Sequence, residues 1–488
     1  MSSDCFAGVK RRIQREMVDS GIPSVAIAVA RHGEVLWEEA YGWADRERRI
    51  PATEHTMYSQ ASVSKPITAT GLMVLVERGR VNLDAPINRY LAPDSQVKVW
   101  IGSPEEVTVR RVANHTAGLP RHENFYRSEE AYPRPPMEES IRRYGNVVAP
   151  PGERYRYSNF GYGILDHLIE RLSGLTFADF MRREVFLPLG MTRTSVDIGP
   201  GLGDFAAARY AEDGVPIPFY AFDHRGASAV YSSVHDLVRF GMLHLKQRQP
   251  DQKAILSDEG IAAMQVPTAD MGIVRTADRN LRPGSKYGIG WVIDDDELGH
   301  RISHGGGMGG AATKLLMLPR EGIVMAAAAN TFCPLPYTIE RDVLSALLPG
   351  YADKLAERDK EPSLPQSSVG PDVRPIRELF GDWRGTVHTY QKDLPLTLSV
   401  KPSGDVHARL GEQLATLVND VEFRDGRLTG KMCGSTETGD ANRRPHHPLH
   451  HLEVDLKLRG DVLTGVVTAI VGNALGHWVE LKKDGGEP

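Results

Sequence analysis

The stretch from Tyr58 to Gly79, YSQASVSKPITATGLMVLVERG, places two serines and a lysine just before an apolar run with helical spacing. A serine hydroxyl becomes a useful nucleophile only beside a base, or beside cations that stabilise its alkoxide. Ser62 and Lys65 are three residues apart, so they share a face if a helix begins near Ser62. Ser64 is the immediate neighbour of the lysine and lacks this geometry. The spacing therefore favours Ser62, although Ser-x-x-Lys alone also fits a capped helix with an exposed lysine.

Two distant motifs carry further polar groups. In RYSNFG, Tyr157 and Asn159 are two residues apart, so an extended chain can aim both at one side. In SHGGGMGG, His304 precedes three glycines, and a strand edge without side chains lets a substrate backbone approach closely. By themselves, Tyr157 fits an aromatic packing residue and His304 a strand-end histidine bonded to the backbone.

Six motifs occur along the chain: SQASVSKPITA, ANHTAGLP, PGERYRYSNFGYGILDHLIERLSG, VFLPLGMTRTS, SAVYSSVHDLVRFG and SHGGGMGG. Their order and spacing resemble the serine β-lactamase and penicillin-binding-protein superfamily. The resemblance is to its class C-like branch, which includes D-aminopeptidases, D-Ala-D-Ala carboxypeptidase-type enzymes and esterases. It covers residues 8–350 of the sequence. It implies acyl transfer through an acyl-enzyme, with no cofactor and no metal.

The resemblance also implies a role for each matching residue. Ser62 would be the acylated nucleophile, and Lys65 would hold positive charge or relay a proton beside it. Tyr157, with its pKa lowered by Lys65, would act as general base and later protonate the leaving group. Asn159 would hold Lys65 and contact the substrate. The backbone N–H groups of Ser62 and Gly307 would form the oxyanion hole.

His304 departs from the pattern, because β-lactamases carry Lys-Thr-Gly at this place. Histidine titrates near neutrality, so it anchors a substrate carboxylate more weakly than a lysine and argues against β-lactam hydrolysis. With Gly305 and Gly306 as substrate-binding backbone, it resembles the His-x-Gly variants of D-aminopeptidases and related esterases. We expect His304 to take part in catalysis by bonding Tyr157 or the substrate. Arg225, in DHRGASAVYSS, is expected near the pocket as a contact for a substrate carboxylate.

Periodicity outlines the elements that must position these residues. SVAIAVARHGEVLWEEAYG predicts two strands joined at His32 and Gly33, and TATGLMVLVERG predicts a helix that ends at Gly79. SSVHDLVRFG begins with a capping-box pattern. The expected fold is an α/β (α+β) sandwich: a β-lactamase-like antiparallel sheet flanked by helices, with a helical subdomain and Ser62 at their junction.

Two domains are predicted. Residues 1–354 form the hydrolase domain, and residues 355–371, charged and then rich in Pro and Ser, form a linker. Residues 372–488 show short alternating strands with Gly and Asp turns, which predict a small antiparallel β-barrel. This barrel is similar to the lipocalin-like domains of some D-aminopeptidase relatives, and the resemblance implies that it lines or covers the cleft.

The composition of the chain indicates which classes of binding partner are not expected. A net charge of −5 over 488 residues gives no sign of nucleic acid or an anionic membrane. The three cysteines are too few and too far apart for a disulfide framework. The N-terminus lacks the apolar core of a signal peptide, and no run of about 18 apolar residues occurs, so a cytoplasmic location without a membrane span is expected. The His446–His451 cluster is interpreted as a polar loop rather than a metal site.

The predicted function is a serine hydrolase that acts on a small molecule or a short peptide. A peptidase of the aminopeptidase type is favoured, with D-amino acids among its candidate substrates. A carboxylesterase acting on small esters is the alternative within the same chemistry. A non-catalytic ligand-binding protein on the same scaffold is the alternative of another class. The sequence leaves the oligomeric state open.

Overall fold

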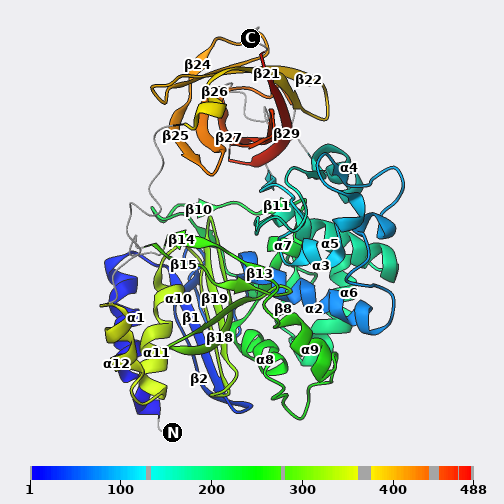
Figure 1. Ribbon diagram of the computed structural model, residues 1–488. Helices are drawn as coiled ribbons and strands as arrows, with labels where there is room; N and C mark the ends of the chain where they lie inside the picture. Colours follow the sequence, from blue (N-terminus) through cyan, green and yellow to red (C-terminus); the bar gives the residue numbers. More distant parts are fainter. Residues whose placement is uncertain are drawn as a thin grey trace.

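The computed structural model describes residues 3–127, 133–275, 281–360, 375–438, 450–470 and 472–484. Figure 1 shows a large mixed domain of strands and helices below and a curled all-β domain above. The expected His446–His451 loop lies outside the described residues except for its last two positions.

A nine-stranded antiparallel sheet forms the centre of the large domain. The first strands of the chain pair with the last strand of the domain, so the two ends of the domain meet in one sheet. In spatial order its strands are β13 (Ala269–Asp270), β16 (Lys286–Tyr287), β17 (Val292–Asp296), β18 (Gly299–Met308), β19 (Ala311–Leu318), β20 (Ile323–Ala329), β1 (Ser24–Arg31), β2 (Glu34–Asp45) and β3 (Ile50–Pro51).

Strand β1 explains why this sheet is buried on both faces. Ala26, Ala28 and Ala30 lie in the core shared with the helical subdomain. Val25, Ile27 and Val29 lie in the core on the opposite face. Because successive side chains of a strand point to opposite faces, a continuous apolar run is needed when both faces are covered. The turn between β1 and β2 holds His32 and Gly33 at positive φ, at the predicted position.

Helices from both ends of the domain cover one face of the sheet (Figure 1). Arg12 of the first helix donates hydrogen bonds to Thr338 and Asp342, so the opening helix lies beside the final ones. These helices are α1 (Ala7–Asp19), α10 (Leu335–Thr338), α11 (Glu340–Leu347) and α12 (Tyr351–Arg358).

The other face carries the helical subdomain. Helix α2 (Ser64–Glu77) is buried along nearly its whole length, so it has apolar or small residues on every side. Helix α8 has Ser233 as its N-cap, whose hydroxyl accepts the Asp236 N–H, as the capping pattern predicts. The remaining helices are α3 (Val109–Ala113), α4 (Met137–Tyr144), α5 (Asn159–Ser173), α6 (Phe177–Met181), α7 (Arg225–Ser228), α8 (Val234–His244) and α9 (Asp258–Met264).

Short strands outside the central sheet form small sheets of two or three strands. They are β4 (Tyr58–Ser59), β12 (Val230–Ser232) and β8 (Thr194–Val196) in one group, and β6 (Phe125–Arg127) with β11 (Tyr220–Phe222) in a second. The others are β5 (Lys98–Val99) with β7 (Asn146–Val147), β9 (Arg209–Tyr210) with β10 (Pro216–Ile217), and β14 (Ile273–Arg275) with β15 (Leu281–Pro283).

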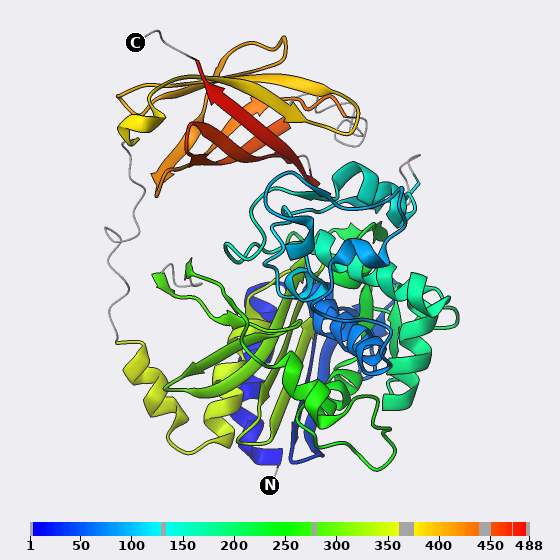
Figure 2. The ribbon, with the colours of Figure 1, turned by 45° about the vertical axis from the view of Figure 1, so that its right-hand side comes forward.

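The C-terminal domain is a nine-stranded antiparallel sheet curled into a nearly closed barrel (Figure 2). Alternate residues of β22 (Leu394, Leu396, Leu398 and Val400) are buried in its core, which is the predicted pattern. In spatial order its strands are β24 (Thr416–Leu417), β23 (Val406–Leu410), β22 (Asp393–Val400), β21 (Gly381–His388), β29 (Ala474–Lys483), β28 (Val462–Ile470), β27 (His450–Arg459), β26 (Arg427–Gly434) and β25 (Asn419–Arg424).

The overall architecture confirms the predicted fold class. The predicted linker at 355–371 overlaps the end of α12, and its residues from 361 onward lie outside the described part of the chain. Among the described helices, none combines the length and apolarity needed to cross a membrane.

Candidate active site

Ser62 lies where the sheet meets the helical subdomain. A short 3-10 helix, Ala61–Val63, runs directly into α2, so the helical turn begins one residue before Ser62. Ala61 holds a positive φ of 45°, an uncommon conformation for a residue with a side chain. The buried Gln60 side chain anchors this bend by donating to Tyr58 O and Ser232 O. Ser62 is half-buried and faces a pocket of 490 Å³.

The two candidate serines have different surroundings. Ser64 is fully buried, and its Oγ accepts the Val230 N–H at 3.0 Å. It therefore ties α2 to β12 and does not reach the pocket lining. Ser62 Oγ is contacted by Lys65 and Tyr157. The environments agree with the choice of Ser62 that the spacing favours.

Lys65 is buried completely and has three oxygen neighbours. Its Nζ lies 3.1 Å from Ser62 Oγ, 2.7 Å from Asn159 Oδ1 and 3.2 Å from Ala227 O. The first contact is the i,i+3 contact expected from the sequence. The second joins the lysine to the YSN motif, which is 94 residues further along the chain.

The YSN tripeptide presents Tyr157 and Asn159 to the same pocket. Tyr157 donates its O–H to Ser62 Oγ at 2.8 Å. Ser158, between them, faces the other way: its hydroxyl donates to Pro120 O and accepts the Gly161 N–H as the N-cap of α5. The alternation of an extended segment thus places i and i+2 in the site and i+1 in the scaffold.

The pKa values of this group differ from the expectation. Burial lowers the pKa of Lys65 well below that of an ordinary lysine, with the Glu123 carboxylate opposing the shift. Burial raises the pKa of Tyr157, although the hydrogen bond to Ser62 opposes the shift. The prediction that Lys65 lowers the pKa of Tyr157 is therefore wrong. In both groups burial disfavours the charged form, which is the ammonium of Lys65 and the phenolate of Tyr157.

The glycines of β18 lie against the nucleophile. A Cβ added at Gly306 would stand 2.2 Å from Gln60 O and 3.0 Å from Ser62 N, so only glycine permits this approach. Thr313 Oγ1 donates to Gln60 O and fixes the same contact. Gly307 lines the pocket beside Ser62, whereas Gly305 and Gly306 do not appear in the lining.

His304 belongs to the same strand and is buried. Its Nε2 lies 3.0 Å from the Tyr287 hydroxyl and its Nδ1 lies 2.7 Å from Gly305 O. Burial lowers the pKa of His304 to about 3, with Lys65 adding to the effect, so the ring is neutral at physiological pH. The geometry does not bring His304 to Tyr157 or Ser62, since both ring nitrogens already have other partners.

Arg225 begins α7 and points away from the pocket. Its guanidinium bonds Glu170 at 2.6 Å and lies 3.8 Å from Asp166. These ion pairs hold α7 in place, and α7 supplies the Ala227 carbonyl that contacts Lys65. Arg225 is absent from the pocket lining, so this geometry gives it no contact with a substrate carboxylate.

The pocket also contains residues that the sequence analysis did not identify. Three are charged, Arg121, Glu123 and Glu212, and the others come from five separate segments. Those others are Ala61, Phe125, Phe222, His224, Ser228, Met308, Gly309 and Phe332. The signals were present in part, since His224 and Ser228 flank Arg225 in the DHRGAS motif.

The barrel contacts a segment of the large domain that lines the pocket. Glu123 and Ala474 exchange two backbone hydrogen bonds, with N···O distances of 2.9 and 2.7 Å. Phe125 N–H donates to Asn473 Oδ1. Leu475 is buried in the core of the large domain. Among the described residues no barrel side chain lines the pocket, and the barrel instead bonds the segment that does. That the barrel covers the cleft stays a prediction.

A second contact reaches the segment before Tyr157. Asp455 of β27 accepts hydrogen bonds from Arg156 at 2.9 Å and from Arg154 at 3.2 Å. Burial alone would raise the pKa of Asp455, but these guanidinium groups, together with Arg427, keep it below the usual value. The barrel carboxylate is thus ionised and pairs with arginines of the large domain.

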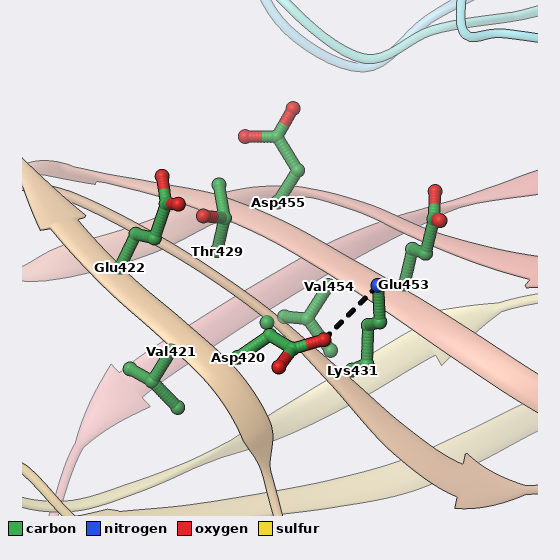
Figure 3. A pocket seen from close by; sticks show the side chains of 9 residues that line it. Asp420, Val421, Glu422, Thr429, Lys431, Glu453, Val454 and Asp455 are labelled. Carbon is green, nitrogen blue, oxygen red and sulfur yellow. Dashed lines mark ion pairs between the residues drawn. The ribbon is translucent and has the colours of Figure 1, made fainter. Parts of the chain in front are cut away.

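A larger groove of 610 Å³ lies on the barrel (Figure 3). It contains Asp455 and a surface pair, Lys431 and Asp420, that lie 3.0 Å apart. No serine, cysteine or histidine is among its described lining residues. Its remaining lining residues are Val421, Glu422, Thr429, Gly430, Glu453 and Val454.

One buried group in the described part of the chain has the residue types of a metal site. The ligand atoms of His122, Asp223 and His224 lie within 4.8 Å of one another. Asp223 accepts a hydrogen bond on each oxygen, from His224 Nδ1 at 2.7 Å and from His122 Nε2 at 2.8 Å. These bonds occupy the atoms that would ligate an ion.

Comparison with known proteins agrees with this geometry. The family model described as Beta-lactamase matches residues 9–348. Penicillin-binding protein 4* of Bacillus subtilis (strain 168) is 27% identical over 315 residues, which cover 59% of this chain and 64% of that protein. The match thus spans less than two thirds of that relative's length.

Two solved structures show the same fold. SurE superposes with a TM-score of 0.63 and 21% identity, covering 99% of both chains. A class C beta-lactamase superposes with a TM-score of 0.59 and 18% identity, covering 71% of this chain and 97% of the other. The first likeness covers nearly the whole chain, barrel included, and the second covers less of it. Because the Beta-lactamase family model matches more than half of the residues of this chain, the chain belongs to the beta-lactamase family.

Proposed function

We propose that this protein is a serine peptidase of the aminopeptidase type, which cleaves amide bonds through an acyl-enzyme on Ser62. One observation carries the proposal: Ser62 Oγ lies within hydrogen-bond reach of both Lys65 Nζ, at 3.1 Å, and the Tyr157 hydroxyl, at 2.8 Å. The proposed nucleophile, Ser62, then lies beside a base, Lys65, and a proton donor, Tyr157, as covalent catalysis requires.

The hydrogen bonds of Lys65 favour it as the base in acylation. A neutral amine has two N–H donors and one lone pair. Asn159 Oδ1 and Ala227 O accept the two N–H groups, so the lone pair faces Ser62 Oγ. The lowered pKa of Lys65 agrees with this neutral form. In the proposed first step, the Ser62 proton passes to Lys65 while the serine oxygen bonds to the substrate carbonyl carbon.

Tyr157 is proposed to complete the proton path. In the tetrahedral intermediate, the negative carbonyl oxygen is stabilised by the Ser62 and Gly307 N–H groups. The Tyr157 hydroxyl then gives its proton to the leaving nitrogen as the C–N bond breaks, and Lys65 returns a proton to Tyr157. Water attacks the acyl-enzyme by the same path in reverse order, which releases the acid and restores Ser62.

His304, Gly305 and Gly306 are proposed to act through the shape of β18. His304 bonds Tyr287 and the Gly305 carbonyl, and Gly306 packs on Gln60. Together they hold the strand edge at a fixed distance from Ser62. We therefore assign them the placement of the oxyanion donors rather than a proton transfer.

A carboxylesterase acting on small esters is the second candidate. Phe125, Phe222, Met308 and Phe332 line the pocket and favour compact apolar groups. Ester cleavage needs less help for the leaving group than amide cleavage, so the same site performs it more easily. The choice depends on whether turnover extends to amides.

The test combines labelling with a substrate panel. A fluorophosphonate probe should label the wild type and Ser64→Ala, and should fail to label Ser62→Ala. Labelling at Ser64 would overturn the assignment. A panel of p-nitroanilides of D- and L-amino acids and of p-nitrophenyl esters separates the activities: amide turnover supports the peptidase, ester turnover alone supports the esterase, and silence supports a binding protein.

A further inference from the structure

A buried chain of three side chains ends in the active-site pocket. His122, Asp223 and His224 are each at least 96% buried. His122 Nε2 lies 2.8 Å from one oxygen of Asp223, and His224 Nδ1 lies 2.7 Å from the other. His224 lines the same pocket as Ser62, whereas His122 and Asp223 do not. The mechanism proposed above uses none of the three.

Asp223 fixes the tautomer of His224. Burial by itself would raise the pKa of Asp223, but His122 and His224 hold it well below its usual value. An ionised carboxylate only accepts hydrogen bonds, so His224 must carry its proton on Nδ1. Burial also lowers the pKa of His224, which keeps the ring neutral. Its Nε2 is then a lone-pair acceptor without a proton.

The Nε2 atom of His224 is the ring nitrogen that Asp223 leaves free. His122 Nδ1 is among the fully buried polar atoms that lack a hydrogen-bond partner, whereas His224 Nε2 is not. An Nε2 atom that lacks a partner and is missing from that group is therefore not fully buried. Among the described residues, no hydrogen bond reaches Nε2. Since His224 also lines the pocket, this atom is the acceptor presented there.

The backbone fixes the distance between this acceptor and the reacting serine. His224 directly precedes α7, and the Ala227 carbonyl of that single turn accepts a hydrogen bond from Lys65 Nζ. The Gly226 N–H of the same turn donates a hydrogen bond to the buried Asp166, which fixes the turn at a second point. His224 is therefore presented by the same turn that orients the base.

The charges of the side chains that line the pocket indicate which chemical groups of a ligand it favours. Arg121 is paired with Glu123 at 3.1 Å, so its charge is neutralised within the lining. Glu212 has no ion-pair partner among the described residues. The lining therefore has a net negative charge and, at His224, a neutral acceptor. Such a site favours an N–H donor with positive charge and disfavours a carboxylate.

We propose that His224 binds substrate, its Nε2 accepting a hydrogen bond from a free amino group next to the scissile carbonyl, and that Asp223 is the positioning residue that keeps Nε2 an acceptor. The inference deepens the proposed function, on which it rests. It assigns the substrate class as compounds with an unblocked amine beside the reacting carbonyl.

Protection against fluorophosphonate labelling tests this binding without turnover. Alaninamide and propanamide differ only in the amino group, and each is added before the probe. For the wild type, alaninamide of one hand should slow labelling at a concentration about tenfold or more below that of propanamide, since a hydrogen bond to a charged group is among the stronger ones. His224→Leu should reduce this ratio to near one, and His224→Gln, which keeps an acceptor oxygen, should restore part of it.

Asp223→Asn tests the tautomer. The asparagine amide donates to Nδ1, so Nε2 gains the proton and becomes a donor; the alaninamide preference should fall as in His224→Leu. The control is His244→Leu, which removes a buried histidine bonded to Thr70 outside the pocket. It should leave the ratio unchanged even where it lowers the melting temperature.

The outcomes separate this inference from the proposed function. An equal ratio in wild type and His224→Leu, with labelling intact, would overturn the role of His224 and leave the serine hydrolase standing. Absence of labelling would count against Ser62 as the nucleophile. In that case calorimetric titration with the two amides still measures the preference and decides the role of His224.

Discussion

Glu123 and Ala474 join the two domains through a pair of backbone hydrogen bonds of 2.9 and 2.7 Å. Glu123 lines the pocket, and Ala474 begins the last strand of the barrel. The next barrel residue, Leu475, is buried in the core of the large domain. The barrel is thus joined both to the backbone of a segment that lines the pocket and to the core of the large domain.

Leu475→Ala should lower both stability and activity. Removing a buried leucine side chain costs about 2–5 kcal/mol of unfolding free energy, and the loosened contact frees the segment that carries Glu123. We expect kcat/KM to fall with KM rising more than kcat falls. Deleting residues 372–488 should alter the substrate range for the same reason.

Leu414→Ala is the matched control for this change, because Leu414 is 89% exposed on the same barrel. It should change the unfolding free energy by less than about 0.5 kcal/mol. Urea denaturation and steady-state kinetics measure both effects. Unchanged kinetics in Leu475→Ala would show that the barrel does not support the pocket.

The pH dependence of acylation should follow Lys65. Burial lowers the pKa of Lys65 from 10.5, so the free amine exists at a pH where an exposed lysine is still protonated. Acylation should therefore rise with pH as Lys65 loses its proton, and then level off. Burial raises the pKa of Tyr157, so its ionisation causes no decline near neutrality. Single-turnover acylation across pH measures the profile.

Lys65→Arg serves as the comparison, since a guanidinium remains protonated throughout. The variant should lose the rising limb and about 10²- to 10⁴-fold in rate, the usual contribution of a general base. A wild-type rate that falls with increasing pH around neutrality would argue that the protonated lysine is the active form.

Tyr157→Phe should affect amides more than activated esters. The change keeps the ring, whose centroid lies 4.5 Å from that of His115, and removes the hydroxyl that contacts Ser62. Amide cleavage should fall about 10²- to 10⁴-fold because the leaving nitrogen needs a proton. A p-nitrophenolate leaves without one, so ester cleavage should fall less. Tyr155→Phe, at the adjacent ring, should change neither, and equal losses on both substrates would contradict the role of proton donor.

Gly306→Ala should disable the site sterically. The added Cβ would stand 2.2 Å from Gln60 O, so the strand must move away from Ser62. A displacement near 1 Å costs about 100-fold in rate. At Gly309, which also lines the pocket, the nearest atom to a Cβ is 3.5 Å away, so Gly309→Ala should retain activity. Full activity in Gly306→Ala would contradict the proposed oxyanion geometry.

Asp455→Asn should weaken the second domain contact. The variant leaves the largely buried Arg156 without its ionic partner, which costs about 3 kcal/mol of unfolding free energy. Asp420→Asn on the same barrel removes only an exposed pair with Lys431 and should cost less than about 1 kcal/mol (Figure 3). Thermal and urea unfolding compare the two, and similar losses would show that the Asp455 pair contributes little.

Local spacing was sufficient for part of the site. The i,i+3 relation of Ser62 and Lys65 and the i,i+2 relation of Tyr157 and Asn159 depend on backbone geometry alone. Ser62 and Lys65 are in contact, and Tyr157 and Asn159 line the same pocket. The strands and helices that carry them follow from apolar periodicity, as in the alternating faces of β1. The order of the motifs then indicated the family.

Other properties depend on contacts between distant segments. The lowered pKa of Lys65 and the raised pKa of Tyr157 follow from their burial, which no short motif encodes. His304 and Arg225 carry the expected residue types, yet Tyr287 and Glu170 bind them away from the pocket.

The sequence by itself determined that Ser62 and Lys65 meet, because the two residues share one helical turn. Only the tertiary structure decided which groups surround the substrate. Glu123 and His224 are 101 residues apart, and they line one pocket because the barrel holds the first and α7 presents the second. Long-range packing, unlike helical spacing, has no period that can be read along the chain.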